Sequence, residues 1–471
     1  MLRCREALPR SCGNVLVPTA TAGVFRQAEP ARQFIPRRSL GTSEPSLRGG
    51  ALQGGAWERA LMEVVVYDKA MRTTWTFASA GQLIFGTDAV AQLGDLAARH
   101  DYRRVLIITD PPLVAAGLLD RIRQPLSKSG IEVELFDGGK PEPSFRIVGR
   151  AMELARRFQP DVLLGLGGGS NIDLAKMLSV VIAHGGDARS YIGDNKVPGP
   201  VTPIIAVPTT AGTGSEISAS CVMTDDVNQI KVGVLSHFMR PRLAVVDPKL
   251  TLSCPRKVTA DSGIDALTHA IEAFTAVDNE RFDLPAGETS IYQGRNPMGD
   301  MIAERAIALA GRHLVRAVNE PENLDARTGM ALAATLAGLA FSNVGVALVH
   351  ALEYPLGGAV HCSHGAGNGL LLPYVMRFNM PGREAEFARI ATLLGRDTRG
   401  MAVKEAAEEA IRAVEEIRTA IGIPTRLRDL GVRDEQLPVF AEKALGIKRI
   451  LRVNPRQPTK EDLIGILAAA W

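Results

Sequence analysis

The sequence predicts an α/β domain on the N-terminal side and an all-α domain on the C-terminal side. Between about residues 75 and 250, short β-rich runs alternate with stretches of helical periodicity. That order is typical of a largely parallel sheet with helices on both faces. After about Thr251, β-branched clusters become rare and the apolar residues follow helical spacing. We therefore expect a leader over residues 1–70, the α/β domain over 71–250 and the helical domain over 251–471.

The individual elements follow from the length and spacing of the apolar runs. In the first domain we expect strands at residues 104–109, 131–136, 161–166 and 203–207, and helices at 113–129, Phe145–Phe158 and 171–184. In the second domain we expect helices at residues 255–274, 298–318, 324–341, 364–378, 383–394 and 401–421. The polar stretch 278–297, rich in Pro and Gly, is expected to be a long loop of the kind that is mobile or functional.

The composition excludes several classes of protein. The net charge of +3 on 471 residues comes from mixed charges that form no basic stripe for nucleic acid. The five cysteines show neither a paired spacing nor a C-x-x-C motif, which indicates a reducing compartment without a disulfide framework. Residues 328–352 are uncharged and long enough to cross a bilayer, but they are rich in Ala and Gly. We interpret them as buried helices.

Residues 1–50 differ from the rest of the chain. They contain eight Arg, three Glu, no Lys and no Asp, with scattered Pro, Ser and Gly. An Arg-rich, acid-poor segment is typical of a transit peptide, but the prolines would interrupt an amphipathic helix and favour a disordered tail. We expect a cytoplasmic protein, with the mitochondrial matrix as the alternative if residues 1–50 are a transit peptide.

A glycine-rich turn stands between a predicted strand and a predicted helix, in the sequence GLGGGSNIDLAK over residues 165–176. Glycines let backbone N–H groups approach a phosphate closely, and the start of a helix adds a favourable dipole. Asn171 or Ser170 could cap that helix. The spacing differs from the usual dinucleotide motif G-x-G-x-x-G, so the turn alone leaves a strand–helix connection without a ligand as the alternative.

Two further features lie at strand ends, where ligands bind in open α/β sheets. The loop PTTAGTGSEIS, residues 208–218, offers hydroxyl groups suited to a ribose, a phosphate or the nicotinamide amide, unless it is an ordinary Ser/Thr turn. Asp110 directly follows the first predicted strand. A carboxylate there can accept hydrogen bonds from a ribose 2′-OH and repel a 2′-phosphate, which favours NAD over NADP. An Asp before Pro111 is also a common turn residue.

Four side chains form the strongest candidate site. Asp265 and His269 stand four residues apart in GIDALTHAIEAF, so they share one face of a helix. His350 and His364 lie in the stretch VHALEYPLGGAVHCSHGAGN. One carboxylate and three imidazoles make a pocket for a divalent first-row metal.

The two later histidines can converge if the chain turns between them. We expect one helix to end near residues 354–355, Gly357 and Gly358 to turn the chain, and a new helix to begin near His364. Cys362 is a possible further ligand, although a buried small apolar side chain is the favoured interpretation. The rival ligands whose spacing points elsewhere are Glu272, Glu353 and His361.

Together these segments resemble the iron-containing (group III) alcohol dehydrogenase family over about residues 75–470, because both long signatures of that family appear in order. The resemblance implies a dehydroquinate synthase-like architecture, with a nucleotide-binding α/β domain, an all-α domain and an active site in the cleft between them. It implies metal ligands at Asp265, His269, His350 and His364. It implies cofactor contacts at Asp110, Gly167, Gly168, Gly169, Ser170, Asp173, Thr209, Thr210, Thr213, Ser218 and Lys231.

One position departs from the family pattern. Many members carry a second His four residues after the third metal ligand, where it is thought to relay a proton. Here that position is Tyr354, whose hydroxyl could still relay but has a much higher intrinsic pKa. Tyr354 and the stretch YQGRNPMGD, residues 292–300, resemble the branch that includes the hydroxyacid-oxoacid transhydrogenases.

We therefore predict a metal-dependent oxidoreductase that transfers a hydride between an alcohol or hydroxy acid and NAD, giving the aldehyde or ketone. The alternative is a hydroxyacid-oxoacid transhydrogenase with a tightly bound nicotinamide cofactor. The family name favours Fe²⁺, although Zn²⁺ would bind the same ligands. We expect small alcohol, aldehyde or hydroxy-acid substrates and a homo-oligomer, with no nucleic acid or membrane as partner.

Overall fold

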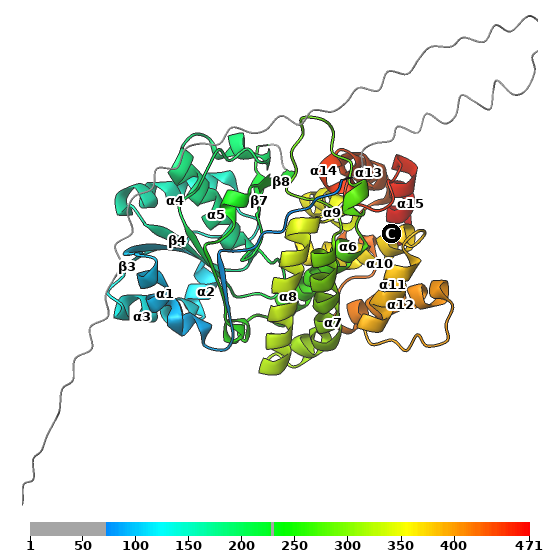
Figure 1. Cartoon of the computed structure of the whole chain (residues 1–471), viewed down its shortest axis with the longest axis horizontal. Coiled ribbons are helices and arrows are strands. Elements are labelled where there is room, and N and C mark those ends of the chain that lie inside the picture. Colours follow the sequence, from blue (N-terminus) through cyan, green and yellow to red (C-terminus); the bar gives the residue numbers. More distant parts are fainter. Residues whose placement is uncertain (1–71, 228–229) are drawn as a thin grey trace, which may run out of the picture. The chain divides into compact units, whose positions relative to one another are not determined.

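The computed structural model describes residues 72–227 and 230–471 (Figure 1). These residues belong to one compact unit, Asp68–Trp471. Strands and helices alternate in its first part, and only helices follow after residue 256, so the predicted fold class is confirmed. The predicted leader over residues 1–70 lies outside the described residues.

The α/β part is built on a six-stranded sheet in which every neighbouring pair of strands is parallel. In spatial order the strands are β1 (Gln82–Phe85), β9 (Leu243–Val246), β6 (Ile204–Pro208), β4 (Val162–Gly167), β2 (Arg104–Ile108) and β3 (Glu132–Phe136). The strands predicted from the sequence are confirmed, with ends shifted by one residue at most. Strands β1 and β9 were not predicted, because runs of four residues are too short to show a period.

Helices cover both faces of this sheet, because successive side chains of a strand point to opposite faces. Leu106 and Ile108 of β2 pack in the core that includes helices α4 and α5, whereas Val105 and Ile107 pack in the core that includes α1 and α3. The helices of this part are α1 (Leu93–Arg99), α2 (Pro111–Ala115), α3 (Leu118–Lys128), α4 (Phe145–Phe158) and α5 (Gly169–His184).

The helix expected over residues 113–129 is a wrong prediction, because the chain forms two helices there. Helix α2 ends at Ala115 and α3 begins at Leu118. Gly117 between them has φ of 75°. Glycine adopts this left-handed conformation without a steric penalty, so it ends one helix and redirects the chain into the next.

A second sheet of three strands adds to the α/β part and was not predicted. Strands β7 (Ser220–Asp225) and β8 (Ile230–Leu235) are antiparallel, and β5 (Gly193–Asp194) pairs with β8 in parallel. Burial alternates strictly along β7, as in a half-buried strand, but its sequence SCVMTD does not alternate apolar and polar residues. This sheet matters for the site because β8 carries Lys231.

The remaining part is helical and encloses one large apolar core. Its helices are α6 (Arg256–Thr275), α7 (Pro297–Asn319), α8 (Leu324–Val344), α9 (Leu348–Val360), α10 (His364–Asn379), α11 (Glu384–Leu393), α12 (Val403–Ala420), α13 (Leu437–Leu445), α14 (Lys448–Leu451) and α15 (Lys460–Ala470). Helix α6 lies at the centre and packs against α7, α8 and α10. The helices predicted from the sequence are confirmed, with ends shifted by up to three residues.

Short 3-10 helices complete the described elements. They are η1 (Ala89–Gln92), η2 (Ala188–Tyr191), η3 (His237–Met239), η4 (Pro248–Thr251), η5 (Asn279–Arg281), η6 (Leu427–Leu430) and η7 (Asp434–Gln436). Apart from η5, the stretch between α6 and α7 forms no helix, which confirms the long loop expected at residues 278–297.

Helix α9 corrects the prediction that a helix ends near residues 354–355. It continues through Pro355 and both following glycines to Val360, and the chain turns only at His361, whose φ is 52°. A proline inside a helix removes one backbone hydrogen bond and costs about 3 kcal/mol. Every residue from Leu348 to Gly357 is buried, so tertiary packing holds the helix together across the proline.

The stretch that resembled a membrane span is divided between two helices. No single helix among the described residues is long and apolar enough to cross a bilayer. Helices α8 and α9 would meet that test only together, and they are bent by 103° at their junction.

Candidate active site

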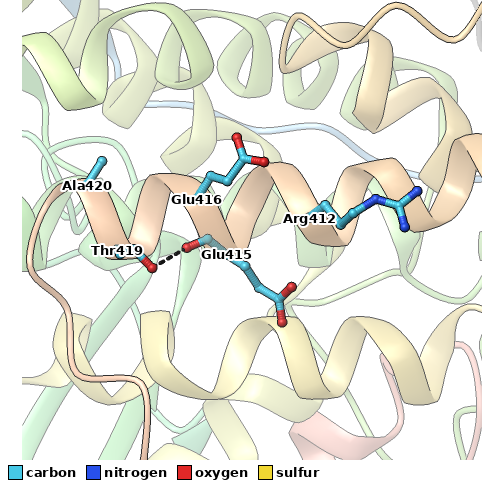
Figure 2. Close-up of a pocket in the computed structure, with 5 residues that line it drawn as sticks. All are labelled: Arg412, Glu415, Glu416, Thr419 and Ala420. Atoms are coloured by element: carbon cyan, nitrogen blue, oxygen red, sulfur yellow. Dashed lines mark hydrogen bonds between the residues drawn. The ribbon is translucent and has the colours of Figure 1, made fainter.

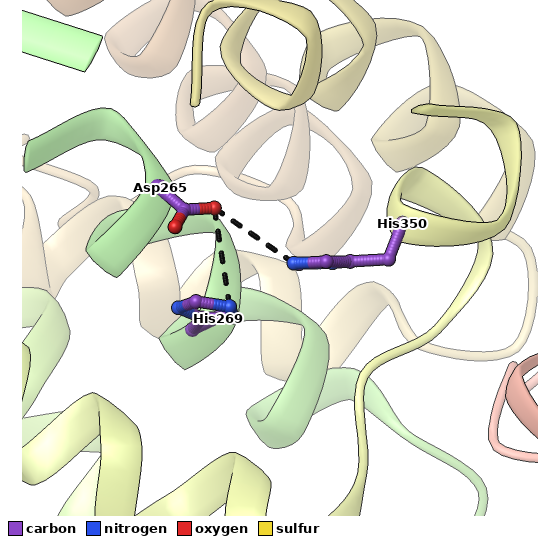
Figure 3. A group of neighbouring side chains, drawn as sticks. All are labelled: Asp265, His269 and His350. Carbon is purple, nitrogen blue, oxygen red and sulfur yellow. Dashed lines mark ion pairs between the residues drawn. The ribbon is translucent and has the colours of Figure 1, made fainter. Parts of the chain in front are cut away.

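The candidate metal ligands come together around Asp265 of α6. Its Oδ1 lies 3.9 Å from Nε2 of His269, one turn further along the same helix, and 3.8 Å from Nε2 of His350 on α9 (Figure 3). The ligand atoms of these three buried residues all lie within 4.8 Å of one another. His364, the first residue of α10, places Nε2 at 4.0 Å from the same Oδ1. Its side chain is 33% exposed, so His364 is the member of the group that reaches solvent.

Two buried glutamates orient two of these imidazoles. Nδ1 of His350 lies 2.6 Å from Oε2 of Glu272, and Nδ1 of His364 bonds to Oε2 of Glu353. When Nδ1–H donates to a carboxylate, Nε2 keeps its lone pair and can bind a metal. The spacing of Glu272 and Glu353 points away from a ligand role, as predicted from the sequence. Each glutamate follows a candidate ligand by three residues: Glu272 follows His269, and Glu353 follows His350. This spacing could have predicted that both carboxylates lie near the imidazoles.

The contacts of Asn368 show that lone pairs of one carboxylate and two imidazoles point at the same position. This residue of α10 is fully buried, and its Nδ2 lies 2.8 Å from Oδ1 of Asp265. The same Nδ2 lies 3.1 Å from Nε2 of His350 and 3.2 Å from Nε2 of His364. An amide nitrogen has two hydrogens, so it cannot satisfy three acceptors. A divalent cation can, and this donor set therefore fits a metal.

Burial keeps the central imidazole neutral. It lowers the pKa of His269 to about 4, against the opposing effect of Asp265. The ring stacks on Phe341 and on His350, with centroid separations of 4.3 and 4.7 Å. Burial would raise the pKa of Asp265, but the facing imidazoles hold it below its ordinary value. A neutral imidazole and an ionised carboxylate are the forms that bind metals.

Glycines on α10 bring its candidate ligand, His364, close to α6. A Cβ on Gly365 would overlap the carbonyl oxygen of Asp261, and a Cβ on Gly369 would lie 2.7 Å from Cγ1 of Ile264. The two helices thus approach each other at positions that admit no side chain. This approach places His364 and Asn368 beside Asp265.

The glycine-rich turn joins β4 to α5. β4 ends at Gly167, and the N-cap of α5 is Gly168, which has no side-chain cap. The prediction that Asn171 or Ser170 caps this helix is therefore wrong. Nδ2 of Asn171 instead donates to Oδ2 of Asp110 at 2.7 Å and to the carbonyl of Leu166 at 3.1 Å. The first backbone N–H groups of α5 thus remain available for a ligand.

The threonine-rich loop lies between this turn and the metal helix. A Cβ on Gly169 would lie 2.8 Å from Oγ1 of Thr213, and a Cβ on Gly168 would lie 3.4 Å from Oγ1 of Thr210. On its other side, a Cβ on Gly212 would lie 2.5 Å from Cβ of Ser262. Ser262 precedes Asp265 by one turn of α6. The threonine-rich loop therefore contacts both the glycine-rich turn and the helix that carries Asp265 and His269.

Several of the predicted cofactor residues have partners within the protein. Asp110 is the N-cap of α2 and accepts from the N–H of Leu113 at 3.1 Å, as a turn residue would. The buried Asp173 accepts from Oγ of Ser215 at 2.5 Å and from the N–H of Val222 at 2.9 Å.

The threonine-rich loop, residues 208–218, is also held by hydrogen bonds within the protein. Oγ of Ser218 accepts from the fully buried Lys176 at 3.1 Å. The N–H of Thr209 donates to the carbonyl of Gly167 at 3.0 Å. Side chains of α5 thus hold Ser215 and Ser218, and the end of β4 holds Thr209.

Lys231 and Tyr354 lie beside the metal cluster. Nζ of Lys231 is 2.9 Å from Oε1 of Glu142 and 3.4 Å from Oε1 of Glu353, and these carboxylates raise its pKa against the effect of burial. The ring centroid of Tyr354 lies 6.1 Å from that of His364, and burial raises the pKa of its hydroxyl. Burial also raises the pKa of the Cys362 thiol to about 12, which favours the protonated form over a metal-binding thiolate.

A separate hollow lies on the surface of α12 (Figure 2). Its volume is about 430 Å³, and it is lined by Arg412, Glu415, Glu416, Thr419 and Ala420. The hydrogen bond drawn there runs from Oγ1 of Thr419 to the carbonyl of Glu415 at 2.8 Å, an ordinary contact within a helix. We assign no ligand to this hollow.

The fold and the site together define a class of metalloenzyme. Its members combine a parallel α/β domain with a helical domain that carries a buried Asp-His cluster. Within that class, the sequence profile described as iron-containing alcohol dehydrogenase matches residues 80–248. The profile described as Fe-containing alcohol dehydrogenase family, C-terminal, matches residues 286–471. The chain belongs to the iron-containing alcohol dehydrogenase family and is an oxidoreductase.

Characterised relatives and solved structures agree with this assignment. The chain is 37% identical over 389 residues to 1,3-propanediol dehydrogenase of Klebsiella pneumoniae, covering 82% of this chain and 96% of that protein. It is 34% identical over 387 residues to NAD-dependent methanol dehydrogenase of Bacillus methanolicus, covering 82% and 97%. A crystal structure of 1,3-propanediol oxidoreductase is similar with a TM-score of 0.79 and 35% identity, covering 84% of this chain and all of that one.

Proposed function

We propose that the chain is a metal-dependent, NAD-linked alcohol dehydrogenase. Its metal ligands would be Asp265, His269, His350 and His364. The observation that carries the proposal is the set of three acceptors facing one amide nitrogen of Asn368. A carboxylate with imidazoles suits either Fe²⁺ or Zn²⁺. We favour Fe²⁺ because the family is named for it.

We further propose that NAD binds along the two loops at the start of α5. The pyrophosphate would contact the backbone of Gly167, Gly168, Gly169 and Ser170. The remaining contacts would come from Asp110, Asp173, Thr209, Thr210, Thr213, Ser218 and Lys231. The open N-terminus of α5 and the absence of a side-chain cap there support this placement. Because Asp110 and Asp173 already have partners, we expect them to act by shaping the loops.

The proposed reaction is hydride transfer between an alcohol carbon and the nicotinamide. When bound, the metal supplies a Lewis acid for the substrate oxygen, and the nicotinamide accepts the hydride. The chain's own task is to hold the reacting groups together. Glu272 and Glu353 keep Nε2 of their histidines directed at the metal position. The hydroxyl of Tyr354 would pass a proton as a neutral donor, since burial raises its pKa.

Small alcohols and the corresponding aldehydes are the substrates that we propose. The named relatives act on 1,3-propanediol and on methanol, and the exposed side of His364 supports entry of a small molecule there. We also propose a homo-oligomer. We place the boundary between the two domains near residue 250, at η4, which joins β9 to α6.

The test is a substrate panel with defined metal and cofactor. Metal-free protein would be reloaded with Fe²⁺ under anaerobic conditions, or with Zn²⁺, and supplied with NAD and short alcohols. We expect NADH to form only when metal is present, and we expect its rate of formation to rise with the alcohol concentration. Absence of NADH formation with every alcohol, on protein that has bound both metal and NAD, would contradict the proposal.

A hydroxyacid-oxoacid transhydrogenase is the second candidate, and Arg449 favours it. This arginine of α14 lies 5.6 Å from the ring centroid of Tyr292 and 3.6 Å from Oδ1 of Asp194. Burial raises the pKa of Tyr354, and Arg449 opposes that effect. A guanidinium beside Tyr354 could receive a substrate carboxylate. The same panel separates the two candidates. A transhydrogenase would convert a hydroxy acid plus an oxo acid without added NAD, whereas a dehydrogenase requires the free cofactor.

A further inference from the structure

Glu353 connects the candidate cofactor lysine with a candidate metal ligand. It lies on α9 and is fully buried, and its two carboxylate oxygens have different partners. Oε2 accepts the hydrogen bond from Nδ1 of His364, on α10. Oε1 lies 3.4 Å from Nζ of Lys231, on β8 of the second sheet. One buried side chain therefore touches both the α/β part and the helical part.

The fold leaves space for this carboxylate by placing glycines beside it. A Cβ on Gly357 would lie 2.5 Å from Oε1 of Glu353 and 2.9 Å from Nζ of Lys231. A Cβ on Gly367 would lie 2.9 Å from Cγ of Glu353. A side chain at either glycine would displace the carboxylate or its partner. The contact is thus part of the packing between α9, α10 and β8.

The charges around Glu353 make its two contacts dependent on each other. A buried carboxylate is costly when it loses its counter-ion. If Lys231 turns towards a cofactor, Glu353 needs positive charge from its other side. A metal on Nε2 of His364 would provide it, because it makes the Nδ1–H group a stronger donor. Conversely, a bound metal would compensate the charge of Glu353 and leave Lys231 free to contact the cofactor.

Glu142 provides a control for the role of Glu353. It is the other carboxylate on Lys231, at 2.9 Å, and its side chain is 37% exposed whereas that of Glu353 is fully buried. Among residues 72–227 and 230–471, its carboxylate forms an ion pair with Lys231 and with no other side chain. Loss of the Glu142 charge changes the surroundings of Lys231 without removing the connection to the metal ligand.

We propose that Glu353 is a positioning residue that couples metal binding at His364 to cofactor binding at Lys231, so that each ligand tightens the binding of the other. The proposal rests on the proposed function, which supplies the metal and cofactor roles of these two residues. Coupling between two binding sites is reciprocal, so the same factor must appear in both affinities. We expect a factor of about 5 or more.

The experiment measures binding, with Zn²⁺ and NADH as probes. Metal-free full-length protein would be titrated with Zn²⁺ against a chromogenic chelator, with and without saturating NADH. NADH affinity would be followed by fluorescence with and without Zn²⁺. The variants are Glu353→Gln and, as the matched control, Glu142→Gln, with thermal unfolding as the check of folding.

In the wild type, each probe should raise the affinity for the other by the same factor. Glu353→Gln should lower Zn²⁺ affinity by about 10–100-fold and bring the coupling factor to about 1. Glu142→Gln should keep the coupling. If Glu353→Gln fails to fold, Lys231→Gln takes its place, and it should also lose the coupling while Zn²⁺ still binds.

Two results would overturn the proposal. One is a folded Glu353→Gln variant with the wild-type coupling factor, and the other is equal loss of coupling in Glu142→Gln. A wild type that binds neither Zn²⁺ nor NADH contradicts the proposed function itself. That failure is distinct from a wild type that binds both probes independently, which contradicts the coupling alone.

Discussion

The His269→Ala variant is expected to lose its bound metal and to fall by more than about 100-fold in kcat/KM for alcohol oxidation. Even an outer partner of a metal ligand typically contributes about 10–100-fold to affinity or activity, so a ligand should contribute more. His269 is the buried member of the cluster that stacks against both Phe341 and His350, and water cannot reproduce its geometry. Elemental analysis gives the metal content, and steady-state NADH formation gives the rate.

His313→Ala is the matched control for this substitution. His313 is also a buried histidine of the helical part, on α7, but it lies outside the ligand group. We expect this variant to retain the metal of the wild type. Thermal unfolding of both variants separates loss of a ligand from loss of the fold. A folded His269→Ala protein with full metal occupancy and full activity would show that the metal is held elsewhere.

Gly169→Val should weaken NADH binding by about 10-fold or more, which corresponds to about 1.4 kcal/mol. A Cβ at this position would lie 2.8 Å from Oγ1 of Thr213, so a branched side chain must push the two cofactor loops apart. It would also cover the start of α5, where we place the pyrophosphate. Fluorescence titration with NADH measures the affinity, and the metal content should stay at the wild-type level.

The matched control is Gly149→Val, in the middle of α4. A Cβ on Gly149 would have no neighbour within 4 Å, so the same substitution meets no obstacle there. We expect its NADH affinity to equal that of the wild type. If folded Gly169→Val protein binds NADH as tightly as this control, the cofactor does not use the glycine-rich turn.

Local pattern was sufficient for much of the fold. Phe145–Phe158 was predicted to the residue, because its apolar positions repeat cleanly at helical spacing and one face packs on the sheet. The pair Asp265 and His269 was predictable for the same reason, since residues four apart share one face of a helix. In both cases the information is contained within one element.

The errors occurred where tertiary packing overrides local preference. Pro355 signals the end of a helix, yet α9 continues, because the residues on both sides of the proline, from Leu348 to Gly357, are buried. The hairpin of β7 and β8 was missed because the sequence of β7, SCVMTD, shows neither a continuous apolar run nor a regular alternation of apolar and polar residues. Such choices depend on the whole core, which local spacing does not contain.

The candidate metal ligands could be predicted from the sequence, but the residues that hydrogen-bond to them could not. Asn368 stands four residues after His364 and shares its helix face, but nothing in the sequence indicates that its amide also faces Asp265 and His350. Glu272 and Glu353 were noticed and set aside, since only the crossing of α6, α9 and α10 brings each to the correct ring nitrogen. Contacts between helices set these roles.

X-ray absorption at the zinc edge of Zn²⁺-loaded protein tests the metal centre most directly. With Asp265, His269, His350 and His364 as ligands, the spectrum should contain only nitrogen and oxygen neighbours, at about 2.0–2.2 Å, with the outer-shell scattering of three imidazoles. A sulfur neighbour at about 2.3 Å would contradict the assignment and implicate a cysteine such as Cys362.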